Sequence, residues 1–221
     1  MNADFFTSLT VSVTLAGVTT LVLLVITPPL AWWLAQTTNR SRPLVEALVA
    51  LPLVLPPTVL GFYLLLAMAG DGPLGGLWSA LTGQPLAFTF AGLVIGSIIY
   101  SLPFVSQPLT ASFRNTSSAM LDAATLLGAS PRRRFWQLVV PSHRRALITA
   151  GVLGFAHTIG EFGIVLMIGG NIPGETRVLS ILLFDQVESL DYAAAHATAL
   201  TLIVVSLATL TATYATVGRA R

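Results

Sequence analysis

Two ionisable side chains, His157 and Glu161, stand four residues apart in a strongly apolar part of the chain. That spacing places them on one face of a helix, where we expect them to contact each other or nearby backbone groups. A proton relay is one chemistry open to such a pair, but a pump would usually show carboxylates spread over several apolar segments, and this sequence does not. A structural or gating role is therefore favoured, with Gly160 and Gly163 loosening or closely packing this stretch.

Prolines mark a second unusual apolar segment, LPLVLPPTVLGFYLLL, which contains Pro52, Pro56 and Pro57. Proline breaks a helix and frees backbone groups, and inside a bilayer these must be satisfied by neighbouring helices or a water-lined cavity. The segment is therefore either part of a transport pathway or hinge, or a kink that only shapes packing. The candidates for a pathway or gate are Pro56, Pro57, Thr58, His157, Glu161 and Gly163. A further apolar segment carries Pro103 and Pro108, where we expect similar breaks.

The one strongly charged island is DAATLLGASPRRRFWQLVVP, from Asp122 to Pro141. We expect Ser118 to cap a helix running up to Gly128, which suits the left-handed position after a helix end. Ser130 then caps a second helix, with Pro131 in its first turn and Pro141 ending it. The sequence thus predicts a helix-turn-helix outside the bilayer.

This helix-turn-helix has the features of a protein-docking surface. The small side chains of Ala123 and Ala124 allow close approach, and Phe135, Leu138 and Val139 form an apolar face of the kind that inserts into a partner's groove. Its arginines also suit contact with anionic lipid headgroups. The predicted docking residues are Asp122, Ala123, Ala124, Gly128, Ala129, Ser130, Arg132, Arg133, Phe135 and Pro141.

Several kinds of catalytic site are excluded by composition. The chain has no lysine, so it cannot contain a phosphate-binding G-x-x-x-x-G-K-[ST] loop. It has no cysteine, no His/Asp/Glu cluster with metal-ligand spacing, and no supported Ser/His/Asp arrangement; Ser142-His143 is interpreted as structural. We therefore expect no catalytic residues, no metal ligands and no cofactor in this chain, and any ATP hydrolysis must come from another polypeptide.

Composition indicates an all-α integral membrane protein, with 54% hydrophobic and 9% charged residues. Apolar runs long enough to cross about 30 Å of hydrocarbon predict roughly five spans. The first is too long for a secretory signal and is expected to remain in the mature protein. The predicted spans are Leu9 to Ala35, Leu44 to Ala69, Ala87 to Leu109, Ala146 to Ile168 and Ala193 to Val217.

Arginine placement predicts the orientation. All 11 basic residues are arginines, and only Arg177 falls on the side that carries most of the acidic residues. By the positive-inside tendency the other side is cytoplasmic, with the N-terminus outside and the C-terminus inside. The net charge of +2 is thereby explained by topology rather than by nucleic-acid binding. The cytoplasmic arginines are Arg40, Arg42, Arg114, Arg132, Arg133, Arg134, Arg144, Arg145, Arg219 and Arg221.

The charged island resembles the loop of bacterial ABC importer permeases, which reads Glu-Ala-Ala, three residues, Gly, nine residues, then Ile, any residue, Leu-Pro. The spacing is reproduced in full, with Asp122, Leu138 and Val140 as conservative departures. The chain is similar over almost its entire length to the permease subunit of molybdate importers. The segments that indicate this similarity are LPLVLPPTVLGFYLLL and Met167 to Arg177. Related sulfate permeases share the Gly-Glu-Phe-Gly element that contains Glu161.

That resemblance implies a type I importer permease fold, with residues 1–221 as one transmembrane domain and a docking loop at about 110–145. It implies a homodimer, two cytoplasmic ATPase subunits that bind ATP and Mg²⁺, and an extracytoplasmic oxyanion-binding protein. The function implied is translocation of molybdate, with tungstate as a second substrate of the same geometry, across a bacterial or archaeal cytoplasmic membrane by alternating access. A sulfate or other oxyanion permease is the alternative, followed by an ATPase-independent secondary transporter or channel and by a non-transporting membrane scaffold.

Overall fold

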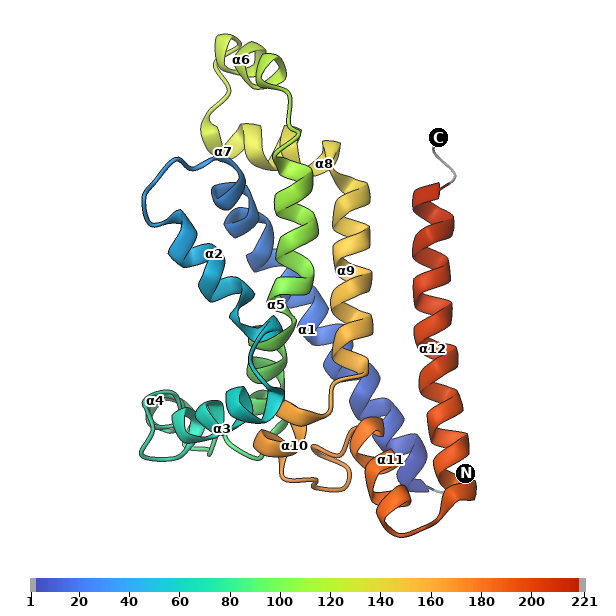
Figure 1. Ribbon diagram of the computed structural model, residues 1–221. Helices are drawn as coiled ribbons and strands as arrows, with labels where there is room; N and C mark the ends of the chain where they lie inside the picture. Colours follow the sequence, from blue (N-terminus) through green and yellow to red (C-terminus); the bar gives the residue numbers. More distant parts are fainter. Residues whose placement is uncertain (1–2, 219–221) are drawn as a thin grey trace.

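Three long apolar helices dominate the computed structural model, which describes residues 3–218. They are α1 (Ala3–Gln36), α5 (Phe90–Phe113) and α12 (Tyr192–Gly218), each long and apolar enough to cross a bilayer. Figure 1 shows α1 and α5 packed with α9 (Arg144–Ile159), whereas α12 stands to one side, against α9 and α11 (Leu179–Glu188). Every element of the described part is helical, as the composition predicts.

The other two predicted spans are bent pairs of helices. α2 (Arg42–Ala50) and the short 3₁₀ helix η1 (Leu51–Leu53) meet α3 (Pro57–Met68) at 108°. The break falls where the prolines predict it, because a residue that precedes proline is driven out of the helical conformation, and Pro56 accordingly has ψ 134°. Counting each bent pair as one span gives the five predicted from sequence.

The second bent pair joins α9 to α10 (Gly163–Gly169) at 60°. Gly160 ends α9 with φ −91° and ψ 0°, and the chain passes through Glu161 and Phe162 before helix resumes. The prediction of one helix through this region, with His157 and Glu161 on a shared face, is therefore wrong. A glycine costs helix stability and allows the break, which hydrophobic periodicity alone does not reveal.

The prolines of α5 behave differently from those of the second span. Pro103 and Pro108 both lie inside one continuous helix, so the predicted breaks are absent there. α5 is enclosed by α1 and α9, and such packing lets a membrane helix tolerate the missing N–H groups. Pro28 and Pro29 also lie inside the continuous helix α1, so two successive prolines do not by themselves break a helix; the break comes at Pro56 and Pro57, between η1 and α3.

The two ends of the bundle differ. α6 (Ser118–Leu126), α7 (Pro131–Arg134) and α8 (Val140–Ser142) project from one end, and α3, α4 (Pro73–Thr82), α10 and α11 form a layer at the other (Figure 1). α4 and α11 were not predicted. The described chain begins at the α11 end, and α12 finishes at the α6 end, as an odd number of crossings requires. The predicted cytoplasmic Arg219 and Arg221 lie outside the described residues.

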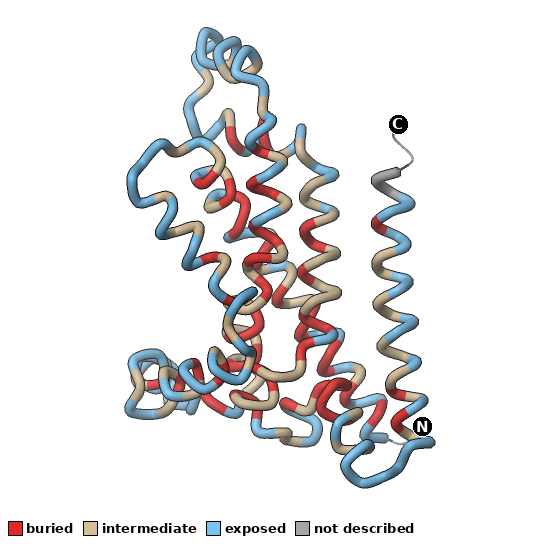
Figure 2. Tube along the Cα trace, in the orientation of Figure 1, coloured by how far each residue is buried: buried red, intermediate tan, exposed pale blue. Residues whose placement is uncertain are grey.

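Buried side chains gather along the facing surfaces of α1, α5 and α9, and α12 is mostly uncovered (Figure 2). One core cluster includes Leu15, Met68, Leu93, Ile164 and Ile168, and a second surrounds Phe113 near the α6 end. Gly96 of α5 admits α10 because a methyl group there would overlap the side chain of Ile168. A small residue at this position thus allows the two helices to pack closely.

Candidate functional site

A cavity of about 610 Å³ lies where the two bent spans break. α3 contributes Pro57 and Thr58, and the break between α9 and α10 contributes Gly160, Glu161 and Phe162. Of the six residues proposed for a pathway or gate, five border this cavity: Pro57, Thr58, His157, Glu161 and Gly163. Pro56 is not among its lining residues, although it immediately precedes α3. The structure thus brings together two segments that are about a hundred residues apart in sequence.

The two broken segments meet in close contact beside the cavity. A methyl group on Gly163 would lie only 2.6 Å from Cβ of Pro57, so glycine is what allows α10 to approach the start of α3. The two half-helices therefore pack as a pair, and a rotation of one must displace the other.

His157 is held by α5 rather than by Glu161. Its ring stacks on Phe104, with centroids 3.7 Å apart, and Nδ1 lies 2.9 Å from Oγ of Ser101. Ser101 Oγ is also 2.9 Å from Oγ1 of Thr158, which donates to the Gly154 carbonyl. Because the Thr158 hydroxyl donates its only proton to that carbonyl, it must accept a hydrogen bond from Ser101. Ser101 in turn accepts from Nδ1–H of His157. The predicted contact between His157 and Glu161 does not form in residues 3–218.

The backbone of Glu161 is held by hydrogen bonds, whereas its carboxylate is not. Its carbonyl accepts a hydrogen bond from Oγ of Ser180 on α11, and its N–H donates to the Thr158 carbonyl at 3.3 Å. The residue is only 4% exposed, yet both carboxylate oxygens lack a hydrogen-bond partner among the described residues. A buried carboxylate in this state is costly, so this side chain is the least satisfied polar group bordering the cavity.

The predicted helix-turn-helix is present at the α6 end, with two changes at its boundaries. Ser117 rather than Ser118 caps α6, accepting from the Met120 N–H at 3.4 Å. Pro141 does not end the second helix, which continues through the π-helical stretch η2 (Phe135–Val139) into α8. In η2 the Val140 N–H reaches back five residues to the Phe135 carbonyl, and this wider turn accommodates the proline ring.

The turn between α6 and α7 has the predicted chemistry. Gly128 has φ +79°, its N–H donates to the Thr125 carbonyl at 2.9 Å, and the Ala129 N–H donates to the Ala124 carbonyl at 3.0 Å. This pair of bonds is the Schellman arrangement that closes a helix through a left-handed residue. Ser130 caps α7 by accepting from the Arg133 N–H at 3.3 Å.

The docking residues divide into an outward and an inward set. Phe135 is 8% exposed and packs against Trp32 of α1 and Phe113 of α5, so it anchors the loop to the bundle and does not face a partner. The prediction of an outward apolar face at Phe135 and Val139 is therefore wrong, because both side chains belong to the core. Exposed or half-buried are Asp122, Ala123, Ala124, Gly128, Ala129, Ser130, Arg132, Arg133 and Pro141.

Two leucines that the sequence interpretation passed over are the apolar feature of this loop. Leu126 and Leu127 are 89% and 88% exposed at the end of α6. Leu-Leu beside a helix-ending glycine, in a loop otherwise rich in charge, was the signal available in the sequence. Arg134 donates to Oγ1 of Thr125, which ties α7 to α6 and keeps this tip in place.

At the opposite end of the bundle the sole arginine is already neutralised. Arg177 Nε donates to Oδ1 of Asn171 at 2.7 Å and lies 3.8 Å from Oδ2 of Asp185. Asn171 in turn donates to both carboxylate oxygens of Asp185. Arg177 therefore clamps the loop between α10 and α11 to α11, and its positive charge is balanced by that of Asp185.

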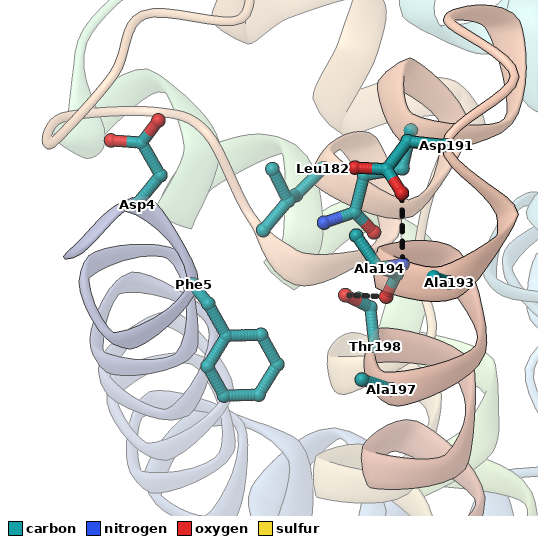
Figure 3. Close-up of a pocket in the computed structure, with 9 residues that line it drawn as sticks. Asp4, Phe5, Leu182, Asp191, Ala193, Ala194, Ala197 and Thr198 are labelled. Atoms are coloured by element: carbon teal, nitrogen blue, oxygen red, sulfur yellow. Dashed lines mark hydrogen bonds between the residues drawn. The ribbon is translucent and has the colours of Figure 1, made fainter. Parts of the chain in front are cut away.

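A further cavity of about 400 Å³ opens between the start of α1 and the α11–α12 corner (Figure 3). Asp4 and Asp191 both border it, and Asp191 also caps α12 by accepting from the Ala194 N–H at 3.1 Å. Two carboxylates at one opening repel an oxyanion. This cavity is therefore a poor site for the kind of ligand that the sequence suggests.

The chain matches the family described as "Binding-protein-dependent transport system inner membrane component" over residues 27–220. It is 55% identical over 182 residues to the molybdenum transport system permease protein ModB of Azotobacter vinelandii, covering 82% of this chain and 80% of that one. It is 34% identical over 181 residues to a probable sulfate transport system permease protein cysT of Zygnema circumcarinatum, covering 82% of this chain and 62% of the relative.

The fold also has a counterpart among solved structures. A chain of a bacterial alginate ABC transporter, crystallised in complex with an alginate pentasaccharide-bound periplasmic protein, superposes with a TM-score of 0.77 at 16% identity. The match covers 96% of this chain and 78% of that one. The all-helical bundle with bent spans is therefore an ABC importer permease fold, and the chain belongs to the family of binding-protein-dependent transport system inner membrane components.

Proposed function

We propose that this chain is the membrane-spanning subunit of an ATP-driven importer that carries molybdate, with tungstate as an equivalent tetrahedral oxyanion. The observation that carries the proposal is the loop from α6 to α8 at one end of the bundle. This loop presents a Schellman turn and two exposed leucines, Leu126 and Leu127. The 55% identity to the Azotobacter relative supports the choice of molybdate.

The subunits that complete the transporter follow from the same arrangement. With no lysine in the sequence, ATP and Mg²⁺ are bound by a separate ATPase, one copy docking on each permease loop. A second copy of this chain completes the pathway, and a soluble oxyanion-binding protein delivers the substrate at the α11 end. The loop end faces the cytoplasm of a bacterial or archaeal cell, since Arg132, Arg133 and Arg134 lie there.

Alternating access then has a mechanical route through the described residues. Phe135 and Val139 anchor the loop in the core beside Phe113. A force that the ATPases apply to the loop is therefore transmitted to α5 and α9. α9 ends at the 60° break, where α10 packs on α3 through Gly163 and Pro57. Movement of α9 therefore reshapes the 610 Å³ cavity, the place where an oxyanion passes between the two faces.

Transport by the reconstituted complex tests the proposal. Proteoliposomes containing this chain and its ATPase, supplied with the binding protein, are expected to accumulate labelled molybdate only with ATP. Excess tungstate should compete, and excess sulfate should compete weakly. Uptake without ATP would contradict the importer assignment, and stronger competition by sulfate than by tungstate would move the substrate to sulfate, which the 34% identity to a sulfate permease makes the second candidate.

A further inference from the structure

A smaller cavity of about 290 Å³ lies at the loop end of the bundle, between α2 and α5 and beside the end of α1. Glu46 of α2 borders it, together with Gln107, Thr110 and Ala111 of α5 and Arg114 at the C-cap of α5. None of these residues belongs to the docking set or to the 610 Å³ cavity. The wall that α5 provides is polar, which is unusual for the end of an apolar span.

The charges around this cavity leave an excess positive charge. Arg42 Nε lies 3.1 Å and Arg114 Nη2 lies 2.8 Å from the same oxygen, Oε1 of Glu46. Two guanidinium groups and one carboxylate carry a net charge of about +1. A guanidinium has five N–H donors, and the bond to Glu46 is the one side-chain bond of Arg114 among the described residues. Arg114 therefore retains donors for an anion.

Thr110 adds a buried hydroxyl with no assigned role. The residue is 8% exposed, it borders the cavity, and its Oγ1 has no hydrogen-bond partner in the described part of the chain. An unpaired buried hydroxyl calls for a partner that the chain itself does not supply. Thr110 of α5 and Arg114 at its C-cap lie four residues apart, on the same side of the helix, and both line the cavity; the covered Thr110 hydroxyl reaches a ligand there by rotating outward.

The two cavities are bordered by the same side of α5. Tyr100 borders the 610 Å³ cavity, and Gln107, Ala111 and Arg114 border the smaller one. Their spacing of seven, four and three residues keeps all four on one side of a helix. This side of the helix therefore runs from the larger cavity toward Arg114 at the loop end.

We propose that the cavity between α2 and α5 is an exit site, in which Arg114 and the hydroxyl of Thr110 hold a tetrahedral oxyanion briefly before release. The proposal rests on the transport function and adds a second, separate binding site to the transport pathway. Glu46 competes with the oxyanion for Arg114, so binding is weak and release is rapid. A lipid phosphate has the same chemistry, but the polar α5 wall of Gln107 and Thr110 favours a free oxyanion over an acyl-chain-bearing one.

Cysteine labelling tests this site cleanly because the chain has no cysteine of its own. Ala111→Cys places a thiol on the cavity wall of the permease assembled with an ATPase that lacks accessible cysteines. An anionic sulfonate-bearing thiol reagent should react there several-fold faster than a cationic ammonium-bearing one. Molybdate or sulfate should slow the reaction, and chloride at equal ionic strength should not.

Matched variants separate a site from general charge effects. Leu48→Cys on α2 is 59% exposed and does not border the cavity, so oxyanions should leave its labelling unchanged. In the Ala111→Cys background, Arg114→Gln should raise the half-protecting oxyanion concentration about tenfold, and Thr110→Val about threefold. Arg145→Gln, which removes a basic residue that does not border the cavity, should leave it unchanged.

Labelling in different detergent and lipid environments distinguishes binding of a lipid headgroup from binding of a free oxyanion. Protection by added oxyanion in lipid-free detergent, and equally in phosphatidylcholine nanodiscs, supports the exit site. Protection that appears in phosphatidylglycerol nanodiscs without any oxyanion would assign the cavity to a lipid headgroup and overturn the proposal. Equal labelling of Ala111→Cys with and without oxyanion would overturn it as well, and ATP-driven uptake by the parent would show that the transport function stands regardless.

Discussion

Nε2 of His143 lies 3.0 Å from Oγ1 of Thr116, which joins the residue after α8 to the segment that follows α5. Thr116 donates its own proton to the Phe113 carbonyl at 2.8 Å, so it must accept from His143. Nδ1 is then the acceptor for Ser112, whose Oγ is 2.8 Å away. The neutral ring thus satisfies both of its nitrogens, on Ser112 near the end of α5 and on Thr116 just beyond it, and His143 is a junction between the loop and the bundle.

The junction at His143 should make stability depend on pH. Burial lowers the pKa of His143 below its ordinary value of 6.5, so the unfolded chain binds a proton that the folded chain does not in the interval just below pH 6.5. Stability contributed here is complete above pH 6.5 and declines as pH falls toward the folded pKa. Melting temperatures of the complex at pH 8 and pH 5.5 should differ less for His143→Gln than for the parent. An unchanged pH dependence in His143→Gln would refute the junction's role.

Gly128→Val should weaken ATPase association without preventing membrane insertion. Nothing lies within 4 Å of a methyl group at Gly128, so the obstacle is the φ of +79°, which costs a β-branched residue about 1–2 kcal/mol or more. Co-purification of the ATPase measures the loss. Gly17→Ala is the matched control, since it also meets nothing within 4 Å and lies inside α1. Undiminished co-purification with Gly128→Val would remove the turn from the docking surface.

Leu126 and Leu127 should carry much of the docking energy. Burying two leucines that are 89% and 88% exposed contributes about 1.5–3 kcal/mol each, so changing both to serine should lower ATPase affinity by at least tenfold. Leu81→Ser, at a leucine 77% exposed in α4 at the opposite end, should have no effect. Titration of the ATPase onto permease in nanodiscs supplies the affinities, and equal affinity in the double variant would mean that the leucines face lipid or solvent.

Reporter fusions should show that the two ends of the bundle face opposite sides of the membrane. Gly72, between α3 and α4, and Gly174, between α10 and α11, belong to one end, and Asn115, after α5, belongs to the other. A reporter that works only outside the cell should be active after Gly72 or Gly174 and inactive after Asn115. Activity at Asn115 alone would invert the orientation.

Glu161→Gln should assemble normally, melt at a temperature no lower than the parent, and retain much of the ATP-driven uptake. It keeps the size of a buried side chain whose two oxygens have no partner, and it removes the cost of burying a charge. Glu161→Ala should be less stable because it leaves a void of several atoms beside the cavity, a cost of about 1–3 kcal/mol. If the Gln variant assembles but transports nothing, and parental uptake depends on a proton gradient, a protonation role for Glu161 is required.

The sequence predicted best what depends on local chemistry. Gly128, Ser130 and Pro131 have conformational preferences strong enough to determine the turn and the second cap on their own. The double proline likewise placed the break before α3. The spans followed from length and apolarity, because the bilayer imposes both.

What the sequence did not predict depends on partners distant along the chain. Phe135 lies inside because Trp32 and Phe113 form a pocket for it, and the π-helical turn of η2 shifts which residues share a face. His157 and Glu161 were separated because the helix ends at Ile159, after which Ser180 holds the Glu161 carbonyl. Ser101 and Phe104, which hold His157, are some fifty residues away and gave no signal.

The loop between α10 and α11, held by Arg177, Asn171 and Asp185, determines how strongly this end of the protein attracts an anion. An anion reaching this end meets a guanidinium that is already committed to a carboxylate, so the permease exerts little attraction of its own. In the importer proposed above, the timing of substrate release then belongs to the binding protein that docks at this end. Selection of the substrate would likewise rest with that binding protein, because the positive charge of Arg177 is balanced by Asp185 and offers little attraction to an unaccompanied anion such as sulfate or phosphate.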